Sequence, residues 1–438
     1  MNIKKFLIFL YFLIISINCF LDQNKNIYSD LYKILSDVNH PLAACSVGII
    51  KNGKILFYDT VGYKQINNED SSQNIKANYK TKFRIASISK LFTTIAIFQL
   101  VEKGLVDLDT DISDYLGFEV RNPNFPNIPI TIKMLLSHTS SIREKGGNDT
   151  STYRIPYPHP ISEFFTEGAE YEFKDRWSDI SQSPNEYFSY CNMGFCLIGT
   201  IIERITGIRF DHYMKQNILK PLGFDSGFNV VEMSVDAKNN IATLYRKLND
   251  KGEYDPNGKW IPQHDDYSKG FPTEDYPEYE IGSNGSLFGP MGSLRISIEE
   301  LTIFMQMLIN NGTYNNIQIL KKETIDKMFS SVWKYDPILK NGDTENGYLL
   351  NYGFGPQIFT NTKNGDKLVD FQDLPFSGHS ADAHGLLGIL SFDRYKQNGI
   401  VIIAEGISNS SYKGEYSAAT GWEENLMTVA AKFAEFDY

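Results

Sequence analysis

A serine and a lysine stand three residues apart at the start of an apolar segment. They are Ser87 and Lys90 in RIASISKLFTTIAIFQLVEKG, residues 84–104. Residues three apart on a helix share one face, about 5 to 6 Å from each other. The N–H groups at a helix N-terminus favour developing negative charge, and burial lowers the pKa of an amine. The pair could therefore form an activated serine nucleophile.

The alternative is that these residues have a structural role. Serine is a common helix cap, so Ser87 or Ser89 could cap the helix while Lys90 stays in solvent. Two further Ser-x-x-Lys patterns begin at Ser331 and Ser410, but neither opens a long apolar helix. Position rather than spacing therefore distinguishes Ser87.

Two other short segments carry candidate residues. Tyr190 and Asn192 stand just before the next apolar helix, in FSYCNMGFCLIG, where they also fit a packing aromatic residue and a helix cap. His379 enters a β-rich segment within Gly378-His379-Ser380. A lone histidine there is more often a hydrogen-bonded core or edge residue than a catalytic one.

Taken together, in this order and on these elements, the three features resemble the serine β-lactamase and penicillin-binding-protein superfamily. The similarity is closest to the class C β-lactamase-like branch, which includes D,D-peptidases, D-aminopeptidases and esterases. Further blocks in family order include ITIKMLLSHTSSI and MGSLRISIEELTIFMQMLINNG, and the resemblance spans roughly residues 82–393.

The resemblance implies catalytic roles for four residues. Ser87 is the expected acylated nucleophile and Lys90 its proton partner. Tyr190 is expected to share the general-base role, with its phenolate favoured by the Lys90 charge. His379 stands where many members carry lysine, and is expected to orient a substrate carboxylate or polarise Tyr190.

The resemblance also implies substrate-binding residues. Asn192 is expected to contact the substrate amide, and Ser380 to bind substrate. The backbone N–H groups of Ser87 and Asp382 are expected to form an oxyanion hole, in which each donor is worth about 2.7 to 4 kcal/mol of barrier.

The sequence departs from the family pattern at several points. The strand carries His379-Ser380-Ala381 where the family usually has His/Lys-Ser/Thr-Gly, so an extra methyl could narrow the substrate groove. Histidine in place of lysine argues against efficient hydrolysis of β-lactam antibiotics. Ser141 replaces a common glycine in the HTSG block, and no glutamate matches the deacylating base of class A enzymes.

Composition and charge exclude several function classes. The 438 residues are 42% hydrophobic, which is enough for a large core, and the net charge is −11 without a basic block. Such a surface repels nucleic acid and anionic lipid. The seven histidines form no His-Glu-x-x-His pattern, so a zinc hydrolase is not expected. We expect no metal and no cofactor.

The N-terminus has the pattern of a secretory signal. Lys4 and Lys5 precede an apolar run over residues 6–15, which is shorter than the roughly 20 residues of a membrane span. We expect a signal peptide at residues 1–19 and a secreted or secretory-pathway protein, with a retained anchor or a lipid on Cys19 as alternatives. The remaining cysteines, Cys45, Cys191 and Cys196, form no disulfide framework. Four sequons suit a glycoprotein: Asn148, Asn284, Asn311 and Asn409.

The hydrophobic pattern predicts an α/β (α+β) fold in one catalytic domain, residues 20–438. A hairpin turning at Asn52-Gly53, a β-rich meander from about residue 352 and a closing helix over 418–436 predict an antiparallel sheet built from both chain ends. The sheet lobe would comprise residues 20–105 and 346–438, flanked by helices, and residues 106–345 would form an inserted, mainly helical lobe. Two long loops, 145–184 and 247–285, stand out, and the second is expected to border the cleft.

The sequence thus predicts a secreted serine hydrolase that forms an acyl-enzyme on an amide or ester. A carboxylesterase of the same fold and a non-catalytic binding or scaffolding protein are the alternatives. The expected partner is a small-molecule, peptide or ester substrate, with no nucleic acid and no membrane span after signal removal; the oligomeric state stays open.

Overall fold

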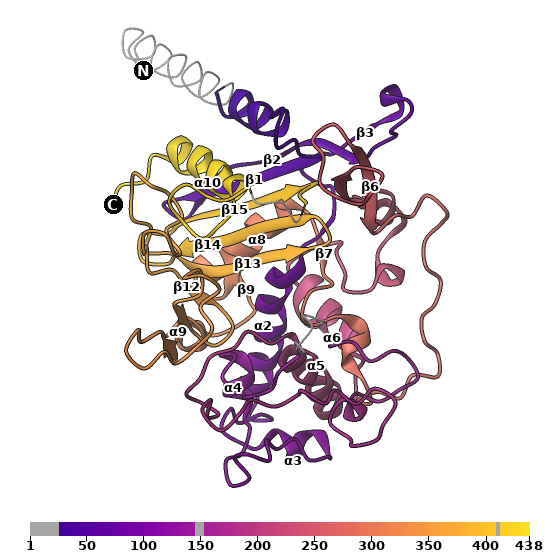
Figure 1. Ribbon diagram of the computed structural model, residues 1–438, viewed down its shortest axis with the longest axis vertical. Helices are drawn as coiled ribbons and strands as arrows, with labels where there is room; N and C mark the ends of the chain where they lie inside the picture. Colours follow the sequence, from indigo (N-terminus) through magenta and orange to yellow (C-terminus); the bar gives the residue numbers. More distant parts are fainter. Residues whose placement is uncertain (1–25, 145–152, 409–411) are drawn as a thin grey trace, which may run out of the picture.

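The computed structural model describes residues 26–144, 153–408 and 412–438 (Figure 1). The expected signal peptide at residues 1–19 and the sequons at Asn148 and Asn409 lie outside the described residues. Within them, no helix combines the length and apolar character needed to cross a membrane.

The sheet joins the two ends of the chain. Strand β1 (Ala44–Lys51) pairs on one side with β2 (Lys54–Gln65) and on the other with β15 (Asn398–Glu405), with Ala44 opposite Glu405. Nine strands, all paired antiparallel, follow the order β10-β11-β12-β13-β14-β15-β1-β2-β3. The others are β3 (Ile75–Lys76), β10 (Trp333–Lys334), β11 (Asn351–Tyr352), β12 (Gln357–Ile358), β13 (Ser377–Ala383) and β14 (Leu386–Asp393). This confirms the predicted fold class.

The turn between β1 and β2 explains why the hairpin was predictable. Asn52 and Gly53 have φ angles of 51° and 73°, the left-handed pair that a tight hairpin turn requires.

A helix covers each face of the sheet. Helix α8 (Ile298–Ile309) packs on one face and α10 (Gly421–Ala434) on the other. Successive side chains of a strand alternate between faces, so Val401 belongs to the core beneath α8 and Ile402 to the core beneath α10. Both α8 and β10 fall within the expected helical lobe, 106–345, yet β10 is a strand of the sheet and α8 packs on its face. The two lobes are therefore interleaved more than the sequence pattern indicated.

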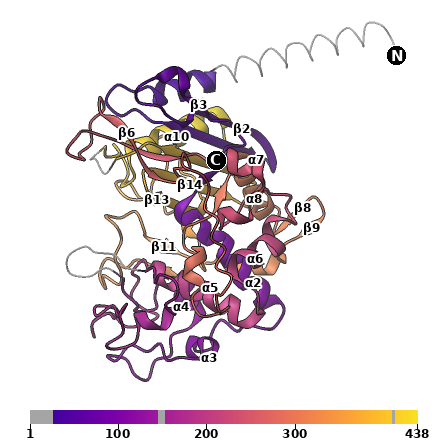
Figure 2. The same ribbon diagram turned by 90° about the vertical axis from the view of Figure 1, so that its right-hand side faces the viewer.

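The helical lobe is built around α2 (Ser89–Glu102) and α5 (Asn192–Thr206), which pack together, although α2 falls within the expected sheet lobe, 20–105. Figures 1 and 2 show α2 between the sheet and the outer helices. The shorter helices are α3 (Ile112–Leu116), α4 (Ile132–Leu136), α6 (Phe210–Met214), α7 (Val235–Asn239) and α9 (Lys322–Met328). Three small strand pairs complete the fold: β4 (Phe83–Arg84) with β7 (Arg295–Ile296), β5 (Leu244–Leu248) with β6 (Lys259–His264), and β8 (Thr313–Tyr314) with β9 (Ile317–Gln318).

One segment of the expected meander, residues 366–372, does not form a strand. Residues 366–372 form turns and bends, although Leu368 and Val369 are buried in the core beneath α10. The Asp366 carboxylate accepts hydrogen bonds from the backbone N–H groups of Thr360 and Thr362, which folds the segment back on itself. A short apolar run thus lies in the core without pairing in a sheet.

Candidate active site

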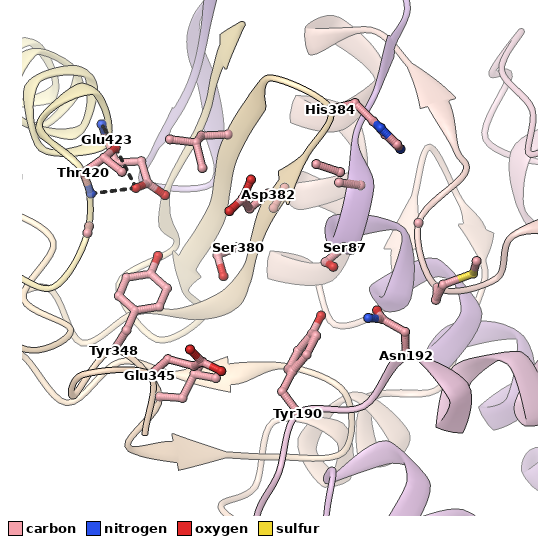
Figure 3. Close-up of a pocket in the computed structure, with 18 of the residues that line it drawn as sticks. Ser87, Tyr190, Asn192, Glu345, Tyr348, Ser380, Asp382, His384, Thr420 and Glu423 are labelled. Carbon is pink, nitrogen blue, oxygen red and sulfur yellow. Dashed lines mark hydrogen bonds between the residues drawn. The ribbon is translucent and has the colours of Figure 1, made fainter. Parts of the chain in front are cut away.

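A cavity of about 490 Å³ lies where the sheet meets the helical lobe. Figure 3 shows Ser87, Tyr190, Asn192, Ser380 and Asp382 around it. The other lining residues include Arg84, Ala86, Tyr153, Arg154, Met291, Gly292, Glu345, Tyr348, His384, Thr420 and Glu423.

Ser87 lies in a 3₁₀ turn, η2 (Ala86–Ile88), that leads directly into α2. The preceding Ala86 has φ = 43°, an uncommon conformation for a residue with a side chain. The turn packs against β13. The serine is therefore presented from a sharply bent backbone toward the strand.

Lys90 is fully buried and donates three hydrogen bonds. Its Nζ lies 3.1 Å from Ser87 Oγ, 2.7 Å from Asn192 Oδ1 and 2.8 Å from the Met291 carbonyl oxygen. Burial lowers the pKa of Lys90 to about 7, although the nearby Glu144 charge opposes this shift. A substantial fraction of the amine is neutral at neutral pH and can accept the Ser87 proton.

Tyr190 approaches Ser87 from the segment before α5. Lys90 Nζ lies 5.0 Å from the centre of the Tyr190 ring, and Figure 3 shows the Tyr190 hydroxyl directed toward Ser87. Among the described residues this buried hydroxyl has no partner with hydrogen-bond geometry. Burial raises the Tyr190 pKa well above its ordinary value, and the Ser87 hydroxyl offsets this only partly. The resting phenol is therefore protonated, which differs from the expected phenolate because burial dominates.

The structure places His379 behind the cavity rather than in its lining. The side chain is 2% exposed, and its ring centre lies 6.2 Å from that of Tyr190. Nδ1 donates to the Ser380 carbonyl at 2.6 Å, so Nε2 accepts from the Tyr352 hydroxyl at 2.9 Å. Burial lowers the His379 pKa to about 3. Both ring nitrogens are occupied and the ring is neutral, so His379 is not placed to bind a substrate carboxylate.

The three expected substrate-binding residues all line the cavity. Ser380 and Asp382 alternate with His379 along β13, so they lie on its other face. Strand β12 pairs with β13 only at Ser377 and Gly378, which leaves the later residues of β13 without a neighbouring strand on that edge in the described sheet. Asn192 accepts from Lys90 through Oδ1 and donates to Glu144 through Nδ2.

Other features of the site were not evident from the sequence. Tyr153 and Arg154 come from the first long loop, whereas the second, 247–285, lines none of the cavity, contrary to expectation. Within the described residues, His264 of that loop contacts the cavity lining through the Arg84 guanidinium and by stacking on His384. Such contacts join residues far apart in sequence, and no local pattern marks them.

Ser89, the neighbouring serine and a possible helix cap, is fully buried and has a structural role. Its Oγ accepts a hydrogen bond from the backbone N–H of Leu294 at 3.2 Å. Ser89→Ala leaves that buried N–H without its partner, so we expect the free energy of unfolding to fall by about 1 to 3 kcal/mol. Urea denaturation measures this change. An unchanged free energy of unfolding would show that the hydrogen bond contributes nothing.

Two other sequence features have defined positions. Ser141 has φ = 65°, so it occupies a left-handed position that favours glycine. Asn284 is 1% exposed, and its Nδ2 donates to the carbonyls of Ile155 and His159. Asn284 is therefore inaccessible for glycosylation in the folded chain.

A candidate metal-binding group lies apart from this cavity. His212, Glu232 and Asp275 offer ligand atoms within 4.8 Å of one another, but none of the three lines the cavity. Lys215 already contacts Glu232, and Arg209 pairs with Asp275. The cations reduce the attraction of this group for a metal ion.

Comparison with solved structures identifies the same architecture elsewhere. The octameric penicillin-binding protein homologue from Pyrococcus abyssi superposes with a TM-score of 0.62 at 24% identity, covering 88% of this chain and 74% of that one. The D-amino acid amidase from Ochrobactrum anthropi SV3, complexed with L-phenylalanine amide, gives 0.64 at 18% identity, covering 95% and 100%. At these identities the similarity establishes the fold.

Curated relatives match over a shorter region. Protein flp of Staphylococcus aureus strain N315 is 31% identical over 190 residues, which is 41% of this chain and 34% of that protein. Penicillin-binding protein 4* of Bacillus subtilis strain 168 is 28% identical over 179 residues, or 40% and 35%. The match therefore spans about a third of the length of these relatives.

The family model described as Beta-lactamase matches residues 38–407, which include the cavity residues from β13 and from η2. This match covers most of the chain and agrees with the fold and with the serine–lysine–tyrosine arrangement. The chain belongs to the β-lactamase family.

Proposed function

We propose that the protein is a serine hydrolase that cleaves an amide or ester through an acyl-enzyme at Ser87. One observation carries the proposal: an alcohol, a partly neutral amine and a protonated phenol meet at one cavity. The family and fold support serine-hydrolase-like activity in general terms.

The geometry supports a defined sequence of proton transfers. Neutral Lys90 accepts the Ser87 proton as Oγ attacks the substrate carbonyl carbon. The N–H groups of Ser87 and Asp382 are the proposed donors to the oxyanion. Tyr190 protonates the leaving amine or alkoxide as the carbonyl reforms, and the Lys90 ammonium returns a proton to the tyrosinate. Water then attacks the ester by the same route and frees Ser87.

Carboxylates and cations both line the cavity. Its lining includes Glu345, Asp382 and Glu423 as well as Arg84 and Arg154, and Figure 3 shows Glu345 and Glu423 on the side occupied by Tyr348, across from Asn192. Burial raises the Asp382 pKa, which the nearby Arg246 charge opposes, and burial together with the Asp382 charge raises the Glu423 pKa to about 7. A bound cation would relieve this repulsion. We therefore infer that a protonated amine, as in an amino-acid amide or a short peptide, binds beside Asp382 and Glu423. The buried, neutral His379 offers no charge to the carboxylate of a β-lactam.

A matched substrate panel tests the substrate class. We expect kcat/KM for a D- or L-phenylalanine anilide to exceed that for its N-acetyl derivative by about tenfold, and turnover of a chromogenic cephalosporin to be lower still. Glu423→Gln should reduce the preference for the free amine, because glutamine keeps the capping contacts with Thr420 but loses the charge. Faster cephalosporin turnover would contradict the assignment, and activity on acyl esters alone would favour the carboxylesterase.

The N-terminal pattern supports a proposed secretory location. Expression in a eukaryotic secretory host, followed by mass spectrometry of the mature N-terminus, would test cleavage near Cys19. An intact N-terminus on the cell-associated chain would instead favour an anchor.

A further inference from the structure

Glu144 is a buried carboxylate behind the catalytic residues that the mechanism above does not use. It is 3% exposed and follows α4 in the HTSSIRE segment. Its Oε1 accepts from Asn192 Nδ2 at 2.7 Å, while Oε2 accepts from the Met193 backbone N–H at 2.7 Å and from Cys191 Sγ at 3.5 Å. Burial raises the Glu144 pKa, whereas the three donors and the Lys90 charge oppose this shift and favour the ionised carboxylate.

These contacts determine which way the Asn192 amide faces. An asparagine amide has similar shape in its two orientations, one the reverse of the other, so its partners decide between them. Glu144 can only accept, so it selects the orientation that directs Asn192 Nδ2 toward itself. Oδ1 then faces Lys90 Nζ at 2.7 Å. In the reverse orientation, the amide N–H groups would face Lys90. The protonated lysine can only donate, so no hydrogen bond would form between them.

The network also affects the charge on Lys90. The titratable groups close to it are Tyr190, Cys191, Cys196, His138, His379 and Glu144. Burial lowers the pKa of both histidines and raises the pKa of both cysteines and of the tyrosine, so all five are neutral near pH 7. Glu144 is the nearby anion that offsets the effect of burial on Lys90.

We propose that Glu144 is a positioning residue for acylation: by accepting from the Asn192 amide it directs Asn192 Oδ1 to Lys90 and so holds the lysine amine beside Ser87. This inference rests on the proposed function, since it assigns a step in the same reaction. A purely structural role is the alternative, because Glu144 also caps the N-terminus of α5 through Met193.

Glu144→Gln in the full chain separates the two roles. Glutamine Oε1 still accepts from Met193, which preserves the cap, but its NH₂ group now faces Asn192 and favours the reversed amide. We expect the rate of Ser87 labelling by a fluorophosphonate to fall by about 10- to 100-fold. The midpoint of its pH dependence should move about one unit lower, because an opposite charge near the amine is lost.

A second variant relocates the charge within the network. In the double variant Glu144→Gln with Asn192→Asp, the new carboxylate can accept from both the glutamine amide and Lys90. We expect labelling to recover by at least tenfold over Glu144→Gln, with the midpoint at or above that of the wild type. Glu144→Asp, which keeps the charge on a shorter side chain, should retain the wild-type midpoint. Loss of the cap alone would not be rescued in this way.

If no probe labels the wild type, that result counts against the proposed function. Direct titration of Lys90 then still tests the role of Glu144. The Lys90 Cε signal of ¹³C-lysine-labelled protein should titrate near pH 7 in the wild type. It should titrate about one unit lower in Glu144→Gln and at or above pH 7 in the double variant. Identical midpoints in all three proteins, or an unchanged labelling rate in Glu144→Gln, would overturn the inference.

Discussion

Ser87→Ala is expected to abolish covalent labelling by a fluorophosphonate or a β-lactam probe and to reduce turnover by about 10⁴-fold or more. The physical reason is that Ser87 Oγ is the hydroxyl within 3.1 Å of the Lys90 amine in the cavity. Mass spectrometry of the digested protein should find the adduct on the Ser87 peptide. The adduct mass should be absent from the alanine variant.

Ser89→Ala is the matched control for this experiment. Ser89 Oγ is committed to the Leu294 N–H inside the protein, so its removal should lower stability yet leave labelling at Ser87 intact. An adduct on Ser89, or full labelling of Ser87→Ala, would contradict the assignment. A wild-type chain that reacts with no probe and turns over no substrate would favour the non-catalytic alternative.

The parts of the site that depend on local geometry were predictable from the sequence. Ser87 and Lys90 are three residues apart on one continuous helical segment, so helix geometry alone brings them together. The hairpin at Asn52 and Gly53 was predictable for the same reason, because two neighbouring residues with positive φ define the turn.

The parts that depend on distant contacts could not be predicted in the same way. His379 was placed on the correct strand, but the sequence does not indicate which face of β13 meets the cavity. The structure shows that Ser380 and Asp382 face it, while His379 bonds to Tyr352 behind Tyr190. Glu144 gave no signal, because its role depends on meeting Asn192 across the fold.

Interior energetics corrected the expected chemistry of Tyr190. Proximity to a lysine suggested a phenolate, which is favoured only if the lysine is charged and the phenol is not strongly desolvated. Both groups are buried, and burial disfavours the charged form of each. The neutral pair, an amine and a phenol, is therefore the form from which the proposed reaction begins, and with a Lys90 pKa of about 7 it is substantially populated at neutral pH.

Lys90 is accordingly expected to control the pH dependence of acylation. Its pKa, lowered to about 7 by burial, means that the neutral amine accumulates as the pH rises through 7. For an uncharged activated ester, kcat/KM should rise about tenfold per pH unit below pH 7 and level off above it. Stopped-flow acylation rates between pH 5 and pH 9 would show this limb, and a flat profile would exclude Lys90 as the base.

Lys90→Met provides the matching variant, because methionine fills similar space without a proton acceptor. Acylation should fall by about 10³-fold or more and lose the limb near pH 7.

Lys90→Met should also raise the free energy of unfolding, because methionine removes a buried charge. The folded-state pKa of Lys90 lies below its unfolded value, so between about pH 7 and pH 10.5 the unfolded chain binds more protons than the folded one. Below pH 7 the cost of burying the Lys90 ammonium lowers the stability of the wild type in full. Between about pH 7 and pH 10.5, the free energy of unfolding of the wild type should rise relative to that of the methionine variant. Urea titrations of both proteins at pH 6 and pH 9 would measure the difference, and a wild-type advantage that shrinks with rising pH would contradict the assigned direction of the pKa shift.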